Sequence, residues 1–132
     1  MPCSLTELSI LERMKNLTNL HRMFLLQRVE KTNEPTLKRI KNAGVSSICL
    51  DKDLLVSGAS TGYIERENKE LIERIHELEM LVFAYTFKNE LFSLKWDYEG
   101  DVRNELQKFY DLGIDGFHSD FPRTVVSFLD SL

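Results

Sequence analysis

Four short apolar segments alternate with helical patterns along the chain, and this alternation constrains the fold more than any other feature. The segments lie at residues 22–27, 45–50, 81–87 and 114–119. A stretch with helical spacing of apolar residues follows each of them. Strands that alternate with helices form parallel sheets through right-handed crossovers. The sequence therefore predicts an α/β fold with four parallel strands in sequential order and with helices outside the sheet.

Capping and stop residues indicate where the helices begin and end. Ser4 and Glu7 fit a capping box, in which each side chain bonds a backbone N–H of the first turn. Asp101 fits the N-cap of a later helix, and Gly113 fits its end. Pro122 fits the first turn of the last helix. The predicted helices span about 4–16, 35–44, 65–79, 101–113 and 122 onward.

The lengths of the loops bear on whether the sheet is open or part of a barrel. Long loops follow the second and third strands, on their C-terminal side, and the returning connections are short. This asymmetry is typical of barrel enzymes, although doubly wound sheets share it. The chain has no glycine-rich phosphate loop, which excludes the common doubly wound cofactor binders. A complete (β/α)₈ barrel takes about 250 residues, and this chain has 132.

The charge and the hydrophobic pattern of the chain bear on its binding partners and on its cellular compartment. The net charge is −4 and no long basic run is present, so nucleic acid is not expected as a partner. No window of about 18 apolar residues predicts a transmembrane helix. The N-terminal segment lacks the pattern of a signal peptide, and as written the chain is expected in the cytoplasm. Cys3 and Cys49 have no metal-site spacing and are expected as free thiols.

Four segments in order carry a resemblance to a known family. The segment DLGIDGFHSDFPRTV at 111–125 resembles the final strand and loop of glycerophosphodiester phosphodiesterases. YTFKNE at 85–90 resembles the penultimate strand of that family, and AGVSSICLDKDLLV at 43–56 resembles the strand before it. ERMKNLTNLHRMFLLQ at 12–27 is similar to the segment that leads into the strand before that. The resemblance implies that residues 1–132 are a partial domain, the C-terminal half of a TIM (β/α)₈ barrel.

The resemblance also implies a reaction and a cofactor. The family hydrolyses glycerophosphodiesters to glycerol 3-phosphate and an alcohol, with a divalent metal (calcium or magnesium) held by acidic residues and with two histidines as acid and base. Its metal ligands and histidines follow a His-Arg-Gly motif in the first half of the barrel, which is not in this sequence. Here His21-Arg22 is followed by Met23, and the pair precedes its strand. No catalytic or metal-binding residue is therefore assigned, and whether this chain is an enzyme stays open.

Five side chains near the expected C-terminal mouth are candidates for a substrate pocket. Each has a structural alternative: Asp120 either caps the last helix or faces the pocket, and Trp96 either lines the pocket or packs within its loop. The candidates are Lys52, Asn89, Glu90, Trp96 and Asp120.

Besides a working enzyme, the sequence allows two other hypotheses for the function of the chain. One is a non-catalytic half barrel that associates with itself or with a missing N-terminal half, and the other is a phosphate-binding module. A half barrel is expected to leave its inner strand face uncovered. The side chains expected on that face include some of Phe24, Leu26, Ile48, Val82, Ala84 and Phe117.

Overall fold

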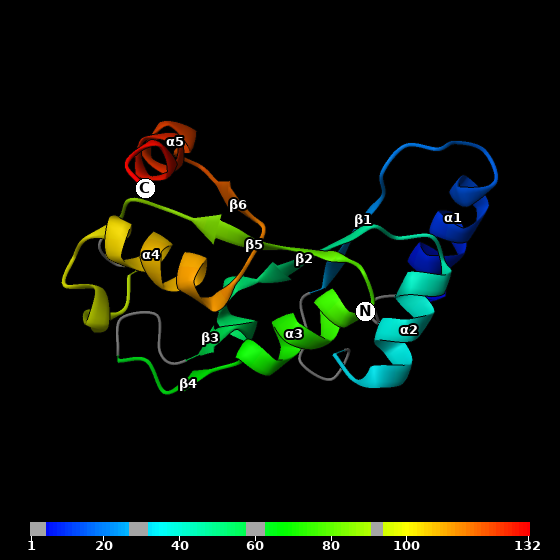
Figure 1. The fold of residues 1–132 in the computed structure, drawn as a ribbon, viewed down its shortest axis with the longest axis horizontal. Coiled ribbons are helices and arrows are strands. Elements are labelled where there is room, and N and C mark those ends of the chain that lie inside the picture. The colour runs from blue at the N-terminus through cyan, green and yellow to red at the C-terminus, as the bar shows by residue number, and fades with distance from the viewer. Residues whose placement is uncertain (1–4, 27–31, 58–62, 91–93) are drawn as a thin grey trace.

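A four-stranded parallel sheet forms the centre of the molecule, as the sequence predicts. The computed structural model describes residues 5–26, 32–57, 63–90 and 94–132, with the side chains of 5–8 excepted. The strands follow the order β1-β2-β5-β6, and every neighbouring pair is parallel. The sequential order and the outer helices confirm the predicted α/β architecture, which corresponds to part of a TIM barrel (Figure 1).

The elements follow one another as a helix and then repeated strand–helix units. The sheet strands are β1 (Met23–Leu26), β2 (Ser47–Asp51), β5 (Leu81–Phe87) and β6 (Gly116–Ser119). The helices are α1 (Leu5–Lys15), α2 (Glu34–Asn42), α3 (Lys69–Glu77), α4 (Val102–Leu112) and α5 (Pro122–Asp130). A separate antiparallel pair consists of β3 (Val56–Ser57) and β4 (Arg66–Glu67).

One face of the sheet packs against the helices and carries the apolar core. Successive strand residues point to opposite faces, so the register places Phe24, Ile48 and Val82 on the same side. Leu37 and Ile40 of α2 belong to the same buried cluster. The prediction that this set of strand residues would be uncovered was therefore wrong. These residues face the helices, and the residues that alternate with them lie on the uncovered face. The residues of the sheet strands that belong to this cluster or pack against it are Phe24, Leu26, Ile48, Leu50, Val82, Ala84, Phe87 and Phe117.

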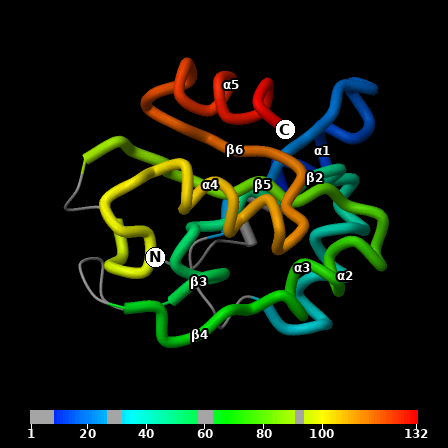
Figure 2. Tube along the Cα trace, turned by 60° about the vertical axis from the view of Figure 1, so that its left-hand side comes forward, coloured from blue at the N-terminus to red at the C-terminus, as the bar shows by residue number. Residues whose placement is uncertain are grey.

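The alternate strand residues form the opposite face. In Figures 1 and 2, α2, α3 and α4 lie on one side of the sheet, and α1 and α5 lie beside its two ends. Met23, Leu25 and Leu81 on the other side are exposed, and Phe83 is partly exposed. Cys49, on the central strand, is buried. In the described part of the chain, no helix covers this face between α1 and α5, and we call it the open face.

Several helix ends lie where the sequence placed them. The Asp101 carboxylate accepts from the backbone N–H of Arg103 at the start of α4, and Gly113 ends α4 with a φ of 99°. That left-handed conformation favours glycine. Pro122 stands in the first turn of α5. Ser4, and with it the predicted capping box, lies outside the described residues.

The segment predicted as a helix over residues 65–79 begins later than expected. Glu65 donates its backbone N–H to Ser57, and Arg66–Glu67 form β4, so these residues are extended. Asn68 then caps α3 through a bond from the backbone N–H of Leu71. The favourable charge pattern of the first residues was misleading, because pairing with β3 and the Asn68 cap decide the boundary.

Asp115 joins three elements at the N-terminal side of the sheet. Its Oδ2 lies 2.8 Å from His76 Nε2 on α3 and also accepts from the backbone N–H of Val82 at 2.7 Å. In the sequence this aspartate stands out only as part of the 111–125 motif. Among the described residues, no helix is long and apolar enough to span a membrane.

Candidate functional site

A pocket of about 240 Å³ opens at the C-terminal ends of β2 and β5. Its walls come from the ends of these two strands, from the loops that follow them and from the inner side of α4. In parallel α/β folds this edge is where ligands bind. The described residues that line it are Asp51, Lys52, Asp53, Val56, Tyr85, Thr86, Lys88, Lys95, Tyr98, Glu105 and Phe109.

A buried ion pair forms the floor of this mouth pocket. Lys52 Nζ lies 3.1 Å from Glu105 Oε2 and 3.3 Å from Oε1, and the two side chains are 14% and 3% exposed. The Lys52 ammonium also lies 5.5 Å from the centre of the Phe87 ring. Burial raises the pKa of Glu105, and the charge of Lys52 opposes that rise. The pair therefore places opposite charges in a site that solvent barely reaches.

Two further lysines lie in the pocket wall. Lys95 is almost fully buried, and its ammonium lies 3.6 Å from the exposed Asp53 carboxylate. Lys88 follows β5 and is partly exposed. In the described part of the chain, no carboxylate lies within ion-pair distance of Lys88. Lys88 thus adds a positive charge that no described carboxylate of the pocket pairs with directly.

After the Lys88 ammonium, the hydroxyl of Tyr98 is the second polar group of the pocket wall for which the described residues provide no partner. Tyr98 is 2% exposed, and its hydroxyl has no hydrogen-bond partner among the described residues. A buried hydroxyl without a partner costs free energy, so such groups call for an explanation. Burial, followed by the charges of Glu105 and other nearby carboxylates, raises the pKa of Tyr98. The hydroxyl is therefore protonated at neutral pH and able to donate.

Of the five candidate pocket residues, Lys52 lines the mouth pocket. Asn89 is exposed and donates from Nδ2 to Thr124 Oγ1 at 2.9 Å, which ties the end of β5 to α5. Glu90 follows it and is partly buried. Neither Asn89 nor Glu90 is among the described residues that line this pocket.

Trp96 and Asp120 also lie outside the described lining of the pocket. Trp96 is 59% exposed and packs edge-on against Tyr63, with ring centres 5.0 Å apart. Asp120 is exposed, and its backbone N–H bonds to Phe87. The N-cap of α5 is Phe121, which has no side-chain cap, and Ser119 Oγ accepts from the Phe121 N–H instead.

Apart from Lys52, none of the described lining residues was a sequence candidate, and two of them left a signal in the sequence. Glu105 lies on the apolar side of the predicted helix, where an acidic residue is rarely buried without a partner. Lys88 directly follows the apolar strand and precedes the candidate Asn89. Lys95 and Tyr98 come from the long loop after β5, where no periodic pattern indicates which side chains turn inward.

The acids of the mouth pocket do not fit the divalent metal that the resemblance implies. Asp51 accepts from the backbone N–H of Asp53, while Asp53 and Glu105 face lysine ammonium groups. Each carboxylate is thus engaged with a donor or a cation. Among the described residues, no group of three His, Cys, Asp or Glu side chains is arranged to hold an ion.

The three histidines are separate from the mouth pocket. His76 pairs with Asp115 at the opposite end of the sheet, and His21 is exposed before β1. His118 is exposed on β6 and contacts the Phe83 ring edge-on, with ring centres 5.9 Å apart. The described lining of the pocket therefore holds lysines, carboxylates and tyrosines but no histidine.

Comparison with known proteins agrees with this architecture. A solved structure from Silicibacter pomeroyi DSS-3, provisionally named a glycerophosphoryl diester phosphodiesterase, superposes with a TM-score of 0.63 at 17% identity. The match covers 95% of this chain and 36% of that one, so this chain spans about a third of its length. No curated protein matches the sequence. Residues 3–124 match the family described as "Glycerophosphoryl diester phosphodiesterase family", and the chain belongs to that family.

Proposed function

We propose that this chain binds the phosphate of a glycerophosphodiester in the mouth pocket and supplies the substrate-binding part of a phosphodiesterase barrel. The observation that carries the proposal is that one pocket is lined by Lys88, which pairs with no described carboxylate, and by Tyr98, whose hydroxyl has no partner among the described residues. A phosphate group would accept from both and offers several oxygens for charge-assisted hydrogen bonds. Family membership supports the choice of a glycerophosphodiester over other phosphate esters.

The ion pairs of the pocket leave Lys88 as a group that can bind a small anion. Lys52 and Lys95 each face one carboxylate, and Asp51 is engaged with a backbone N–H. With Lys88 the described lining holds three lysines and three carboxylates, and Lys88 is the lysine among them that no described carboxylate pairs with directly. The volume of about 240 Å³ is suited to a small phosphate ester, since drug-sized ligands fill pockets of roughly 300–1,000 Å³.

Calorimetric titration with three ligands tests the proposal. We expect glycerol 3-phosphate and glycerophosphocholine to bind the purified chain and glycerol to show no binding. Tyr98→Phe removes the hydroxyl and leaves the ring in place, so we expect about tenfold weaker binding without loss of folding, because a hydrogen bond to a charged group contributes roughly 1.5–3 kcal/mol. Lys88→Gln should weaken binding by a similar factor.

The matched control is Lys38→Gln, which removes one positive charge from an exposed position on α2. It should leave the affinity unchanged. Absence of binding by both phosphate compounds at millimolar concentration contradicts the proposal. Equal affinity of the wild type, Tyr98→Phe and Lys88→Gln also contradicts it, because binding would then occur elsewhere.

A further inference from the structure

We infer that two copies of this chain assemble around their open faces into one closed eight-stranded barrel. The inference goes beyond the proposed function and does not depend on it. Parallel sheets occur almost only with both faces covered, and the open face leaves one side of this sheet without helices in the described residues. A second copy of the chain would provide the missing cover.

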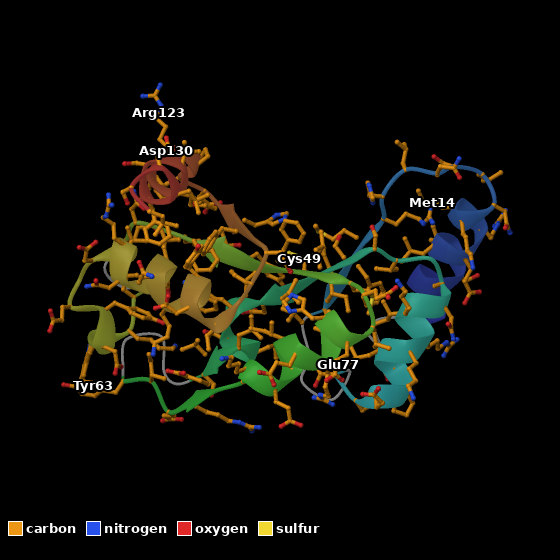
Figure 3. The ribbon with its side chains drawn as sticks, in the orientation of Figure 1. Met14, Cys49, Tyr63, Glu77, Arg123 and Asp130 are labelled. Carbon is orange, nitrogen blue, oxygen red and sulfur yellow. The ribbon has the colours of Figure 1, made fainter. Side chains whose placement is uncertain are left out.

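Exposed apolar side chains gather beside the two edge strands of the sheet, β1 and β6. One group lies on α1, on the segment after it and on β1, beside the open face. The other lies on α5 and at the C-terminus, at the opposite end of the sheet (Figure 3, where Met14 and Arg123 mark the two ends). The first group is Ile10, Met14, Leu17, Leu20, Met23 and Leu25, and the second is Val126, Leu129 and Leu132. We call these groups the first-edge and last-edge surfaces.

The exposed area is sufficient for a stable dimer. Leu25 is 54% exposed and Leu81, on the open face, is 50% exposed. Leu81 and the residues of the two edge surfaces, which include Leu25, expose on the order of 1,000 Å² in one chain, against roughly 800 Å² per partner in a standard interface. A monomer in water would keep this apolar area exposed, and its burial would favour association.

The topology permits closure by a two-fold axis along the strands. The strands run parallel in the order β1-β2-β5-β6, so β6 of one copy can lie beside β1 of the other in the same direction. The same contact then recurs at the second junction, and the assembly is closed with eight strands. Each first-edge surface meets the last-edge surface of the other copy, and the two open faces become the interior of the barrel.

The oligomeric state of the purified chain tests this inference. Light scattering coupled to gel filtration should give twice the 15.4 kDa chain mass at micromolar concentration. Met23→Glu on β1 and Val126→Glu on α5 each place a charge in one junction, so we expect the dimer to dissociate about tenfold or more readily. Lys69→Glu, at an exposed position on α3, is the matched control and should remain dimeric.

Cross-linking distinguishes barrel closure from other dimers. In a Cys3→Ser background, chains with Leu25→Cys and chains with His118→Cys are mixed and treated with a short thiol cross-linker. Closure places β1 beside β6 of the other copy, so we expect mixed cross-links and few between two Leu25→Cys chains.

Three results would overturn the inference. They are a folded monomer at high concentration, a dimer that neither edge variant weakens, and cross-links only between like chains. A cooperative unfolding transition for each variant shows that a loss of dimer is not a loss of fold.

Discussion

The ammonium of Lys52 lies 3.1 Å from Oε2 of Glu105 and joins the end of β2 to the middle of α4. The two residues are 53 positions apart in sequence and meet at the floor of the mouth pocket. Taking two charges out of water is costly, and the pair is stable because each charge compensates the other. The pair therefore fixes α4 against the strand end while it holds charge beside the pocket.

Removing one partner of this pair is expected to destabilise the fold strongly. Glu105→Gln leaves the Lys52 ammonium without its counter-charge, and Lys52→Met leaves the Glu105 carboxylate without one. Each variant should lower the free energy of unfolding by about 3 kcal/mol, near the lower end for a broken buried pair. Urea unfolding measured at neutral pH gives this difference.

The double variant Lys52→Met/Glu105→Leu separates pairing from packing. It replaces both charges by apolar groups, so its stability should lie close to that of the wild type or above it. If the two single effects simply added in the double variant, the ion pair would not be the reason for the losses.

Stability is expected to fall as pH rises from about 4 toward neutrality, because of Glu105. Burial raises the pKa of this carboxyl above its value of about 4.3 in the unfolded chain. The folded state therefore holds the proton more tightly, and its advantage is complete below the unfolded pKa and disappears as pH rises through the folded pKa. Urea unfolding across this range should show a smaller decline in Lys52→Met/Glu105→Leu than in the wild type, and equal slopes would contradict the assignment.

The sequence predicts the sheet well because local patterns determine it. Apolar runs of strand length separated by amphipathic helices leave little choice of topology, and the four strands lie in the predicted order. Asp101 and Gly113 act through their own backbone neighbours, so their roles are readable without tertiary information. The phase of the strand faces was not readable, because the central residues of β2, Ile48–Leu50, form an apolar run without alternation and are buried on both faces.

The mouth pocket is less predictable because its residues come together only in the folded chain. Lys52 was found because it directly follows a strand. Tyr98 and Lys95 turn inward from a long loop, and nothing local distinguishes them from Trp96, which is exposed. The contacts of Asp115 could not be predicted for the same reason, since its bonds to His76 and Val82 depend on how α3 and the sheet pack.

Gly116 is expected to tolerate no side chain, because Phe83 occupies the adjacent space. A Cβ at Gly116 would overlap the Phe83 ring on the neighbouring strand. Gly116→Ala should lower the free energy of unfolding by about 1–3 kcal/mol, the usual cost of overpacking. Thermal unfolding of Gly116→Ala alone and combined with Phe83→Ala tests the cause. The combined variant should lose less than the sum of the two changes, and strict additivity would show that the ring is not the obstacle.

The purified 132-residue chain is expected not to hydrolyse glycerophosphodiesters. General acid–base catalysis contributes roughly 10²–10⁴-fold, and a metal ion contributes further by neutralising charge on the phosphate. His21, His76 and His118 lie outside the described lining of the mouth pocket, and its carboxylates face lysines or a backbone N–H. Binding of the phosphate by Lys88 and Tyr98 would then proceed without proton transfer.

Release of glycerol 3-phosphate from glycerophosphocholine, with calcium or magnesium present, measures this activity. We expect no release above the buffer rate, even at substrate concentrations that saturate the mouth pocket. Metal-dependent turnover that His118→Ala or Asp51→Asn abolishes would contradict the prediction, because the chain would then carry a catalytic site of its own. Turnover that both variants retain would point to a contaminating enzyme, and repeating the assay on a separately purified preparation identifies that case. Since Asp51 lines the mouth pocket and His118 lies on the open face, the variant that loses activity would also locate the reaction at one of these two places.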